Sequence, residues 1–188
     1  MPALSPHRPK KDELLAARGR SVPDVIAPGL KVLFCGINPG LYSGATGHHF
    51  AHPGNRFWTA LFRAGFTGRQ LSPYDEHLLL DSGYGIINIV NSATVQAGEL
   101  SAGELQTGWK IVEKKVLEFR PEVLAVLGID AYRKAAGRPK AKMGRQAETI
   151  GETAVWVLPN PSGINAAYQM NDLVNLLLQL KAGTEHPV

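Results

Sequence analysis

Four short runs of apolar residues constrain the fold of this 188-residue chain more than any other feature. Each run is rich in β-branched or aromatic residues, and three of them end at a glycine or a proline. We therefore predict buried strands at residues 31–35, 85–90, 123–127 and 154–158. Apolar runs without polar alternation are typical of parallel strands that are covered on both faces.

Helical spacing of apolar residues separates or follows these runs, at Asn55–Ala64, Leu105–Phe119, Asp130–Ala136 and Asp172–Leu180. The third helix follows a strand directly, and Asp130 is a candidate N-cap for it. Strands that alternate with helices predict an α/β fold with a parallel sheet covered on both sides. In such folds ligands bind beyond the carboxyl ends of the strands.

The length predicts a single domain, because domains average about 150 residues. Residues 1–22 form a basic arm or a leading helix, and residues 23–188 form the domain. The formal net charge is +4, and a second basic cluster lies between residues 131 and 148, where Glu148 is the one acid. Its basic residues are Arg133, Lys134, Arg138, Lys140, Lys142 and Arg145. Two such clusters favour a polyanionic partner, and the alternative is an ordinary solvated surface.

Several classes of protein are excluded. With the one cysteine, Cys35, the chain has no internal disulfide and no Cys-rich zinc or iron–sulfur site of its own. The three close histidines, His48, His49 and His52, have no further ligands at suitable spacing, so we expect no metal. There is no apolar leader, and no run approaches the ~20 residues of a membrane span. We expect a cytoplasmic location and no membrane partner.

Two loops after predicted strands could carry chemistry. The first spans residues 36–50 and is rich in glycine, but it matches neither a Walker loop nor a dinucleotide fingerprint. It could present backbone N–H groups to an anion or a carbonyl oxygen, or it could simply be a turn that needs its glycines. The second, residues 159–165, contains two prolines that make it stiff. Its apolar Ile164 could enter a base stack or could fold back onto the core.

Three ordered motifs in these regions resemble the mismatch-specific uracil/thymine DNA glycosylases, especially the bacterial Mug type, within the uracil-DNA glycosylase superfamily. They are Gly36-Ile-Asn-Pro-Gly40, Phe50-Ala-His-Pro-Gly-Asn-Arg-Phe-Trp58 and Asn160-Pro-Ser-Gly163. The resemblance extends from about Val32 to Leu180. It implies a single three-layer α/β/α domain with a short, mainly parallel central sheet.

The resemblance also implies roles for individual residues. Asn38 matches the asparagine that positions the attacking water. The base pocket would comprise Ile37, Gly40, Ser43, Phe50 and Asn88, with Phe50 stacking on the extruded pyrimidine. The loop that enters the duplex would comprise Pro161, Ser162, Gly163, Ile164 and Asn165. The basic residues at 133–145 are candidate phosphate contacts.

The chain departs from the family pattern after the second strand. Relatives commonly place Asp or Glu and then Arg there, whereas this chain has Asn91-Ser92-Ala93. One hypothesis is that Ala93, or Asn91, stands where a functional side chain belongs, and the alternative is that Ala93 packs a loop. Asn165 also stands where relatives often have Ser or Arg, and Asn160 replaces the histidine of single-strand-active relatives.

The expected function is a monofunctional DNA repair glycosylase. It would flip uracil, with thymine and modified pyrimidines as further candidate bases, out of G·U or G·T mismatches in double-stranded DNA. It would hydrolyse the N-glycosidic bond and leave abasic DNA, with no cofactor, as a monomer. One alternative is a mismatch- or abasic-site-binding protein with weak or disabled catalysis. Another is a binder of small nucleotides or nucleobases on the same fold.

Overall fold

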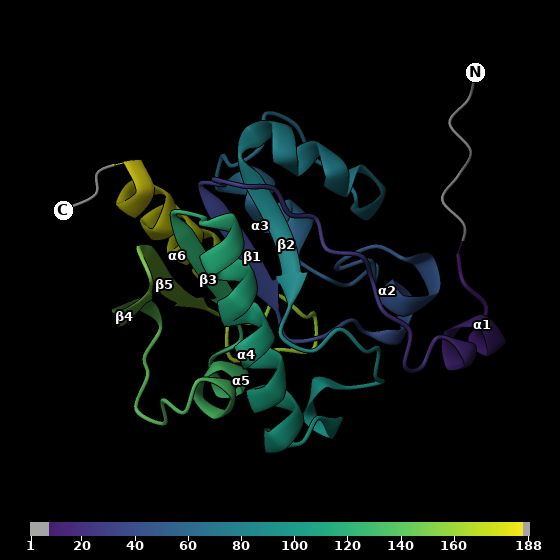
Figure 1. Cartoon of the computed structure of the whole chain (residues 1–188). Helices are drawn as coiled ribbons and strands as arrows, with labels where there is room; N and C mark the ends of the chain where they lie inside the picture. Colours follow the sequence, from purple (N-terminus) through teal and green to yellow (C-terminus); the bar gives the residue numbers. More distant parts are fainter. Residues whose placement is uncertain (1–7, 186–188) are drawn as a thin grey trace.

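A five-stranded sheet forms the centre of the molecule in a computed structural model that describes residues 8–185 (Figure 1). Its strand order is β2-β1-β3-β5-β4. The strands are β1 (Val32–Gly36), β2 (Tyr84–Asn88), β3 (Val123–Leu127), β4 (Gly144–Ile150) and β5 (Thr153–Leu158). Strands β2, β1, β3 and β5 are parallel neighbours, and β4 runs antiparallel to β5 at one edge. The α/β class with a mainly parallel sheet is thus confirmed.

The predicted strand at residues 123–127 has the observed bounds, and the other three predictions overlap β1, β2 and β5. Strand β4 was not predicted. Its residues alternate between partly buried and exposed positions, as expected for an edge strand with one covered face. Because it is mostly polar and lies within the basic cluster, the sequence shows no apolar run there.

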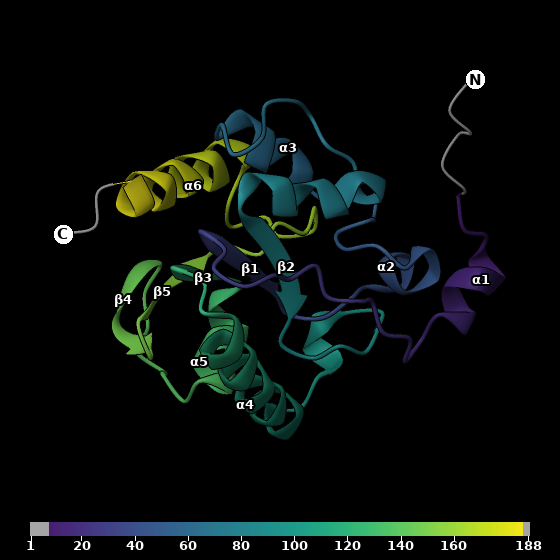
Figure 2. The same ribbon diagram turned by 45° about the horizontal axis from the view of Figure 1, so that its top comes forward.

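Helices cover the sheet on two sides (Figure 2). On one side lie α3 (Phe57–Arg63), the 3-10 helix η1 (Pro73–Ser82) and α6 (Met170–Glu185). On the other lie α4 (Ala102–Phe119) and α5 (Ile129–Ala135). Successive residues of β1 point to opposite faces, so Phe34 joins the core under α3, while Leu33 and Cys35 join the core under α4. The result is the expected three-layer arrangement.

Helix α5 begins differently from the prediction. Its N-cap is Gly128, and Asp130 lies in the first turn, where it pairs with Arg133 at 3.3 Å. The φ of Gly128 is +144°, and a Cβ there would come within 2.8 Å of Ile37 Cδ1. Glycine is therefore required for both backbone conformation and space. The prediction of Asp130 as the N-cap was wrong because this close approach, and not a side-chain cap, starts the helix.

The N-terminal segment contains α1 (Lys11–Ala16) and then packs onto the domain. Ala17 and Val22 are fully buried, so packing begins before the predicted boundary at residue 22. Residues 1–7 of the arm or leading helix predicted for residues 1–22 lie outside the described residues. Two short elements complete the fold, α2 (Leu41–Thr46) and the 3-10 helix η2 (Ala97–Glu99). No helix within residues 8–185 has the length and apolarity needed to cross a membrane.

Candidate functional site

A cleft of about 1120 Å³ opens at the carboxyl ends of β1, β3 and β5, the place where open parallel sheets bind ligands. The segments that follow β1, β2, β3 and β5 contribute its walls. Every residue assigned above to the base pocket lines it, together with Asn38. So do Ser162, Gly163, Ile164 and Asn165 of the predicted intercalation loop. The sheet thus brings together two motifs that lie more than 100 residues apart.

The side chain of Asn38 is held by its amide nitrogen. Nδ2 donates to the carbonyl oxygen of Ser92 at 2.9 Å and to Thr94 Oγ1 at 2.8 Å, with a longer contact to Pro39 O at 3.1 Å. Carbonyl oxygens can only accept, so they fix the nitrogen on this side of the amide. Oδ1 accepts no hydrogen bond from the described residues. The cleft therefore contains a hydrogen-bond acceptor, Asn38 Oδ1, that is fixed in orientation and has no partner among the described residues.

Ile37 and Gly40 contribute backbone to the cleft on either side of Asn38. The Ile37 side chain packs against Gly128, which also lines the cleft. Gly40 precedes α2 as its N-cap with no side-chain cap, and its backbone pairs with the Thr94 segment. Thr94 N donates to Pro39 O at 3.1 Å, which joins this loop to the segment after β2.

The floor of the cleft is formed by Gly36, Phe50 and Asn88. A Cβ on Gly36 would lie 2.5 Å from Asn88 Oδ1 and 3.3 Å from the Phe50 ring, so only glycine lets these two side chains meet there. Phe50 adopts φ +51° and stacks on Phe57 with ring centroids 4.2 Å apart. Positive φ is strained for an aromatic residue and persists only where the surroundings impose it. An aromatic ring and an unpaired amide thus lie side by side.

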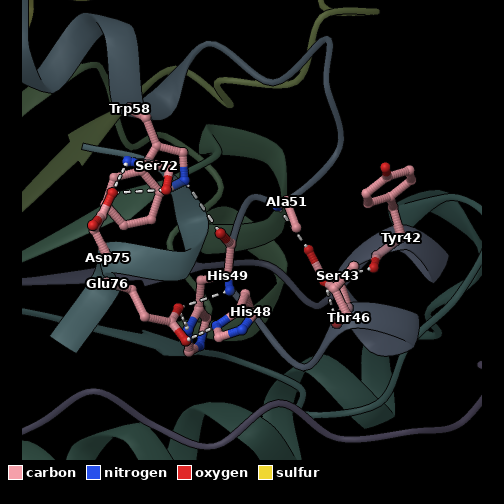
Figure 3. Close-up of polar contacts among 10 residues, drawn as sticks. All are labelled: Tyr42, Ser43, Thr46, His48, His49, Ala51, Trp58, Ser72, Asp75 and Glu76. Atoms are coloured by element: carbon pink, nitrogen blue, oxygen red, sulfur yellow. Dashed lines mark hydrogen bonds and ion pairs between the residues drawn. The ribbon is translucent and has the colours of Figure 1, made fainter. Parts of the chain in front are cut away.

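Ser43 lines the cleft, and its hydroxyl supports the segment that carries Phe50. Its Oγ accepts a hydrogen bond from Ala51 N at 3.1 Å, and its side chain is buried (Figure 3). The bond connects α2 to the residue after Phe50. Tyr42 lies in the cleft lining, and Figure 3 shows its ring turned away from Ser43.

Glu76 of η1 anchors the segment before Phe50. Its carboxylate accepts from the backbone N–H of His49 at 2.8 Å and from His49 Nδ1 at 2.9 Å, and it also pairs with His48 Nδ1 at 2.8 Å (Figure 3). Trp58 Nε1 donates to His49 O at 3.3 Å. His49 is 2% exposed, and its Nε2 has no partner in the described part of the chain.

The charge on Glu76 is stabilised by these donors. Burial would raise the pKa of the Glu76 carboxyl, but the hydrogen bonds from the His49 ring, the His49 backbone and His48 outweigh it and hold the pKa below its ordinary value. The two histidines therefore donate hydrogen bonds to the Glu76 carboxylate, and they are not part of a candidate metal-binding cluster among the described residues. Within residues 8–185 no cluster of three or more His, Cys, Asp or Glu side chains could hold a metal ion.

The loop after β5 presents Ile164 at its tip with 83% of the residue exposed. The alternative that Ile164 folds back onto the core is therefore wrong. Inside the loop, Ser162 N donates to Asn160 Oδ1 at 2.9 Å, and Asn165 Nδ2 donates to Asn160 O at 3.0 Å. Asn160, which belongs to the third motif, and Asn165 thus brace the loop. Residues 159–168 are called the wedge loop below.

Asn91 and Ala93 lie outside the cleft lining. Asn91 exchanges two hydrogen bonds with the backbone of Val22, and Ala93 is 1% exposed, with its backbone bonded to Gly19 and Arg20. A Cβ on Gly44 would come within 2.7 Å of Ala93 Cβ. This is the packing role of Ala93. Whether an acid at either position would raise activity stays a prediction.

Two of the basic residues at 133–145 make polar contacts within the protein, and the other four extend into solvent. Arg133 donates to Ala141 O at 2.8 and 3.0 Å, and Arg138 pairs with Glu148 at 3.3 Å. Lys134, Lys140, Lys142 and Arg145 are exposed. Met143, in the same loop, lines the cleft, so the loop reaches its edge.

Four contributors to the site left no sign in the sequence pattern. Glu76 lies in an unpredicted 3-10 helix, and Arg8, Pro9 and Leu14 of the N-terminal segment line the cleft although they precede the motifs. Arg56 lies in the second quoted motif and Thr94 directly follows Asn91-Ser92-Ala93, but the partners of both become visible only in the fold.

Two comparisons with known proteins agree with this geometry. Residues 23–181 match the family model described as the uracil DNA glycosylase superfamily. A solution NMR structure of a candidate uracil DNA glycosylase from Methanosarcina acetivorans superposes with a TM-score of 0.60 at 18% sequence identity. The match covers 89% of this chain and 99% of that protein, and at this identity it shows a shared fold.

Proposed function

The chain belongs to the uracil DNA glycosylase superfamily, and from that membership we propose a DNA repair enzyme of the mismatch-specific, monofunctional type. Membership implies a glycosylase that hydrolyses N-glycosidic bonds and acts on DNA. The finer proposal is excision of uracil from G·U, and also of thymine or modified pyrimidines from G·T-like pairs, in double-stranded DNA. The product is an abasic site, and neither a metal nor an organic cofactor takes part.

The orientation of Asn38 carries the proposal. With Nδ2 bound to Ser92 O and Thr94 Oγ1, the open Oδ1 can accept a hydrogen bond from a water molecule and hold it in the cleft. An amide does not take up a proton near pH 7, so Asn38 acts by orientation and not as a base. We therefore expect a slow enzyme compared with glycosylases that use a carboxylate.

The floor of the cleft suits a flipped pyrimidine. Phe50 can stack on its ring, and the Asn88 amide can donate to one carbonyl oxygen of uracil while accepting from N3–H. No described residue occupies either polar atom of Asn88. Extrusion costs a few kcal/mol and is easiest for a mismatched base, and the exposed Ile164 can fill the vacated place in the stack.

The reaction balances without a redox partner. The water oxygen forms a bond to C1′, the C1′–N1 bond breaks, and its electron pair leaves with the base. The backbone N–H groups of Ile37 and its neighbours can stabilise the resulting negative charge on the base, as in an oxyanion hole. The water proton is released to solvent or to the departing base.

One observation favours the alternative of a mismatch- or abasic-site-binding protein with weak catalysis. Within the described residues, Asp130 is the one carboxylate that lines the cleft, and it pairs with Arg133. It is not available as a general base beside Asn38.

A single-turnover assay on a duplex with one central G·U pair tests the proposal. The wild type should produce alkali-labile abasic sites, and Asn38→Ala should lower the rate by about 10³-fold, since orientation of the water is lost. Asn171→Ala, an exposed asparagine on α6, serves as the matched control and should cleave like the wild type. Absence of cleavage with intact mismatch binding would instead support the binding protein.

A further inference from the structure

Arg56, which lies just before α3, donates hydrogen bonds to four backbone carbonyls of the wedge loop. Nη1 donates to Tyr168 O at 2.6 Å, Nη2 to Ser162 O at 2.8 Å and to Asn165 O at 3.1 Å, and Nε to Pro161 O at 3.4 Å. The backbone N–H of Arg56 also donates to Pro161 O at 3.0 Å. A guanidinium has five N–H donors, so almost all of its capacity is used on one loop.

No carboxylate pairs with Arg56 among the described residues. Its charge is balanced by carbonyl dipoles alone, and these carbonyls would otherwise need water. The loop has no strand partner at this point, and its own hydrogen bonds, through Asn160 and Asn165, fix only its internal turn. The bonds from Arg56 are therefore those that fix the loop relative to the rest of the site.

The same segment carries the base-stacking residue. Five residues separate Phe50 from Arg56, and one of them, Gly54, touches the wedge loop directly. A Cβ on Gly163 would lie 2.5 Å from Gly54 O, so the two backbones are in contact with no side chain between them. Asn55 Oδ1 accepts from Phe57 N at 2.9 Å and fixes the turn where Arg56 lies.

We propose that Arg56 is the positioning residue that sets Ile164 at a fixed place relative to Phe50, so that filling the stack and receiving the base occur together. This inference rests on the proposed function and deepens it. Arg56 is not among the described residues that line the cleft. It acts through the wedge loop, so its loss should impair extrusion of a stacked base far more than cleavage of a base that is already free.

The test compares Arg56→Gln with the wild type on uracil in a G·U duplex and on uracil in a single strand. Misplacement of the wedge by about 1 Å should lower the single-turnover rate on the duplex by about 10²-fold. The rate on the single strand should fall by less than about threefold, because no stack has to be filled. A 2-aminopurine beside the uracil reports extrusion directly, and its fluorescence rise should be lost in parallel with duplex cleavage.

Two further variants make the test specific. Arg56→Lys keeps the charge but cannot reach four carbonyls with one ammonium, so it should fall between the wild type and Arg56→Gln. Arg63→Gln changes an exposed arginine on α3, the helix that follows Arg56, and should behave like the wild type. Thermal melting of each variant accompanies the rates.

The outcomes separate the two proposals. Equal losses on duplex and single strand, or no loss on either, would overturn the positioning role. If the wild type does not cleave the duplex, the proposed function fails. Where the wild type does not cleave the single strand, the 2-aminopurine signal on the duplex tests the role of Arg56 by itself. A fluorescence rise in the wild type that is lost in Arg56→Gln would support the positioning role. Equal fluorescence rises in the two proteins would refute it.

Discussion

The two walls of the cleft are anchored by opposite charges. The wall that carries Phe50 is held by a carboxylate, Glu76, which accepts hydrogen bonds from the segment at His48 and His49. The wedge loop is held by a guanidinium, Arg56, which donates to backbone carbonyls. In both cases a single side chain outside the loop satisfies several of its polar groups.

The difference lies in how each anchor responds to pH. An arginine stays charged at every pH at which proteins fold, so the wedge loop keeps its anchor in acid. Glu76 can be protonated, and its lowered pKa means that its contribution to stability is present above the ordinary glutamate pKa of about 4.3 and is lost as pH falls through the folded value. Acid should therefore loosen the base pocket before the wedge.

The largest effect expected from this comparison is on stability. Glu76→Gln removes a charged acceptor from two ring N–H groups and one backbone N–H, which should lower the free energy of unfolding at pH 7 by about 2 kcal/mol. Urea denaturation at several pH values measures it. The variant should also lose less stability than the wild type as the pH falls from 5 through the folded pKa of Glu76.

Glu118→Gln is the control, since this exposed carboxylate lies on α4 away from the cleft. Its unfolding curves should coincide with those of the wild type. Parallel acid profiles for Glu76→Gln and the wild type would show that Glu76 is not the pH-sensitive anchor.

A smaller effect should follow from the wedge side chain itself. Ile164→Ala leaves the loop and its Arg56 anchor in place and removes only the part that fills the stack. We expect the single-turnover rate on a G·U duplex to fall by about tenfold, with little change on single-stranded uracil. Leu178→Ala, which truncates an exposed leucine on α6, is the matched control. A larger loss of rate for Ile164→Ala than for Arg56→Gln would show that the Ile164 side chain matters more for cleavage than the anchor that positions its loop.

The smallest effect concerns the basic loop beside the cleft. Replacing Lys140, Lys142 and Arg145 with glutamine should weaken duplex binding and flatten its dependence on salt. The slope of log K against log salt should fall by about 0.9 for each phosphate contact that is lost. Lys110→Gln with Lys114→Gln, two exposed lysines on α4, should leave the slope unchanged. An unchanged slope in the first variant would place that loop away from DNA.

The sequence was sufficient to predict those strands and helices that a local pattern of residues determines. The run at residues 123–127 is apolar throughout and has no alternative to a buried strand, and its bounds match β3. Strand β4 could not be found in this way, because an edge strand covered on one face contains Arg145, Gln146 and Glu148 and reads as a polar loop.

The site shows the same limit. Asn38 and Phe50 could be assigned from motifs, yet the orientation of the Asn38 amide depends on Ser92 and Thr94, which are more than 50 residues away. The anchoring roles of Glu76 and Arg56 depend on partners in other segments, and neither leaves a local pattern. A charged residue that satisfies backbone groups looks, in sequence, like any residue of the surface.

The placement of the chain ends has a practical consequence for anyone who builds on this protein. Arg8 and Pro9 line the cleft, whereas α6 begins at Met170, after the wedge loop, and its far end lies on the opposite side of the molecule in both views (Figures 1 and 2). A fluorescent domain or affinity tag attached just before Arg8 would therefore start beside the opening of the cleft. The same cargo attached at the end of α6 would start away from that opening, so this end suits immobilisation better.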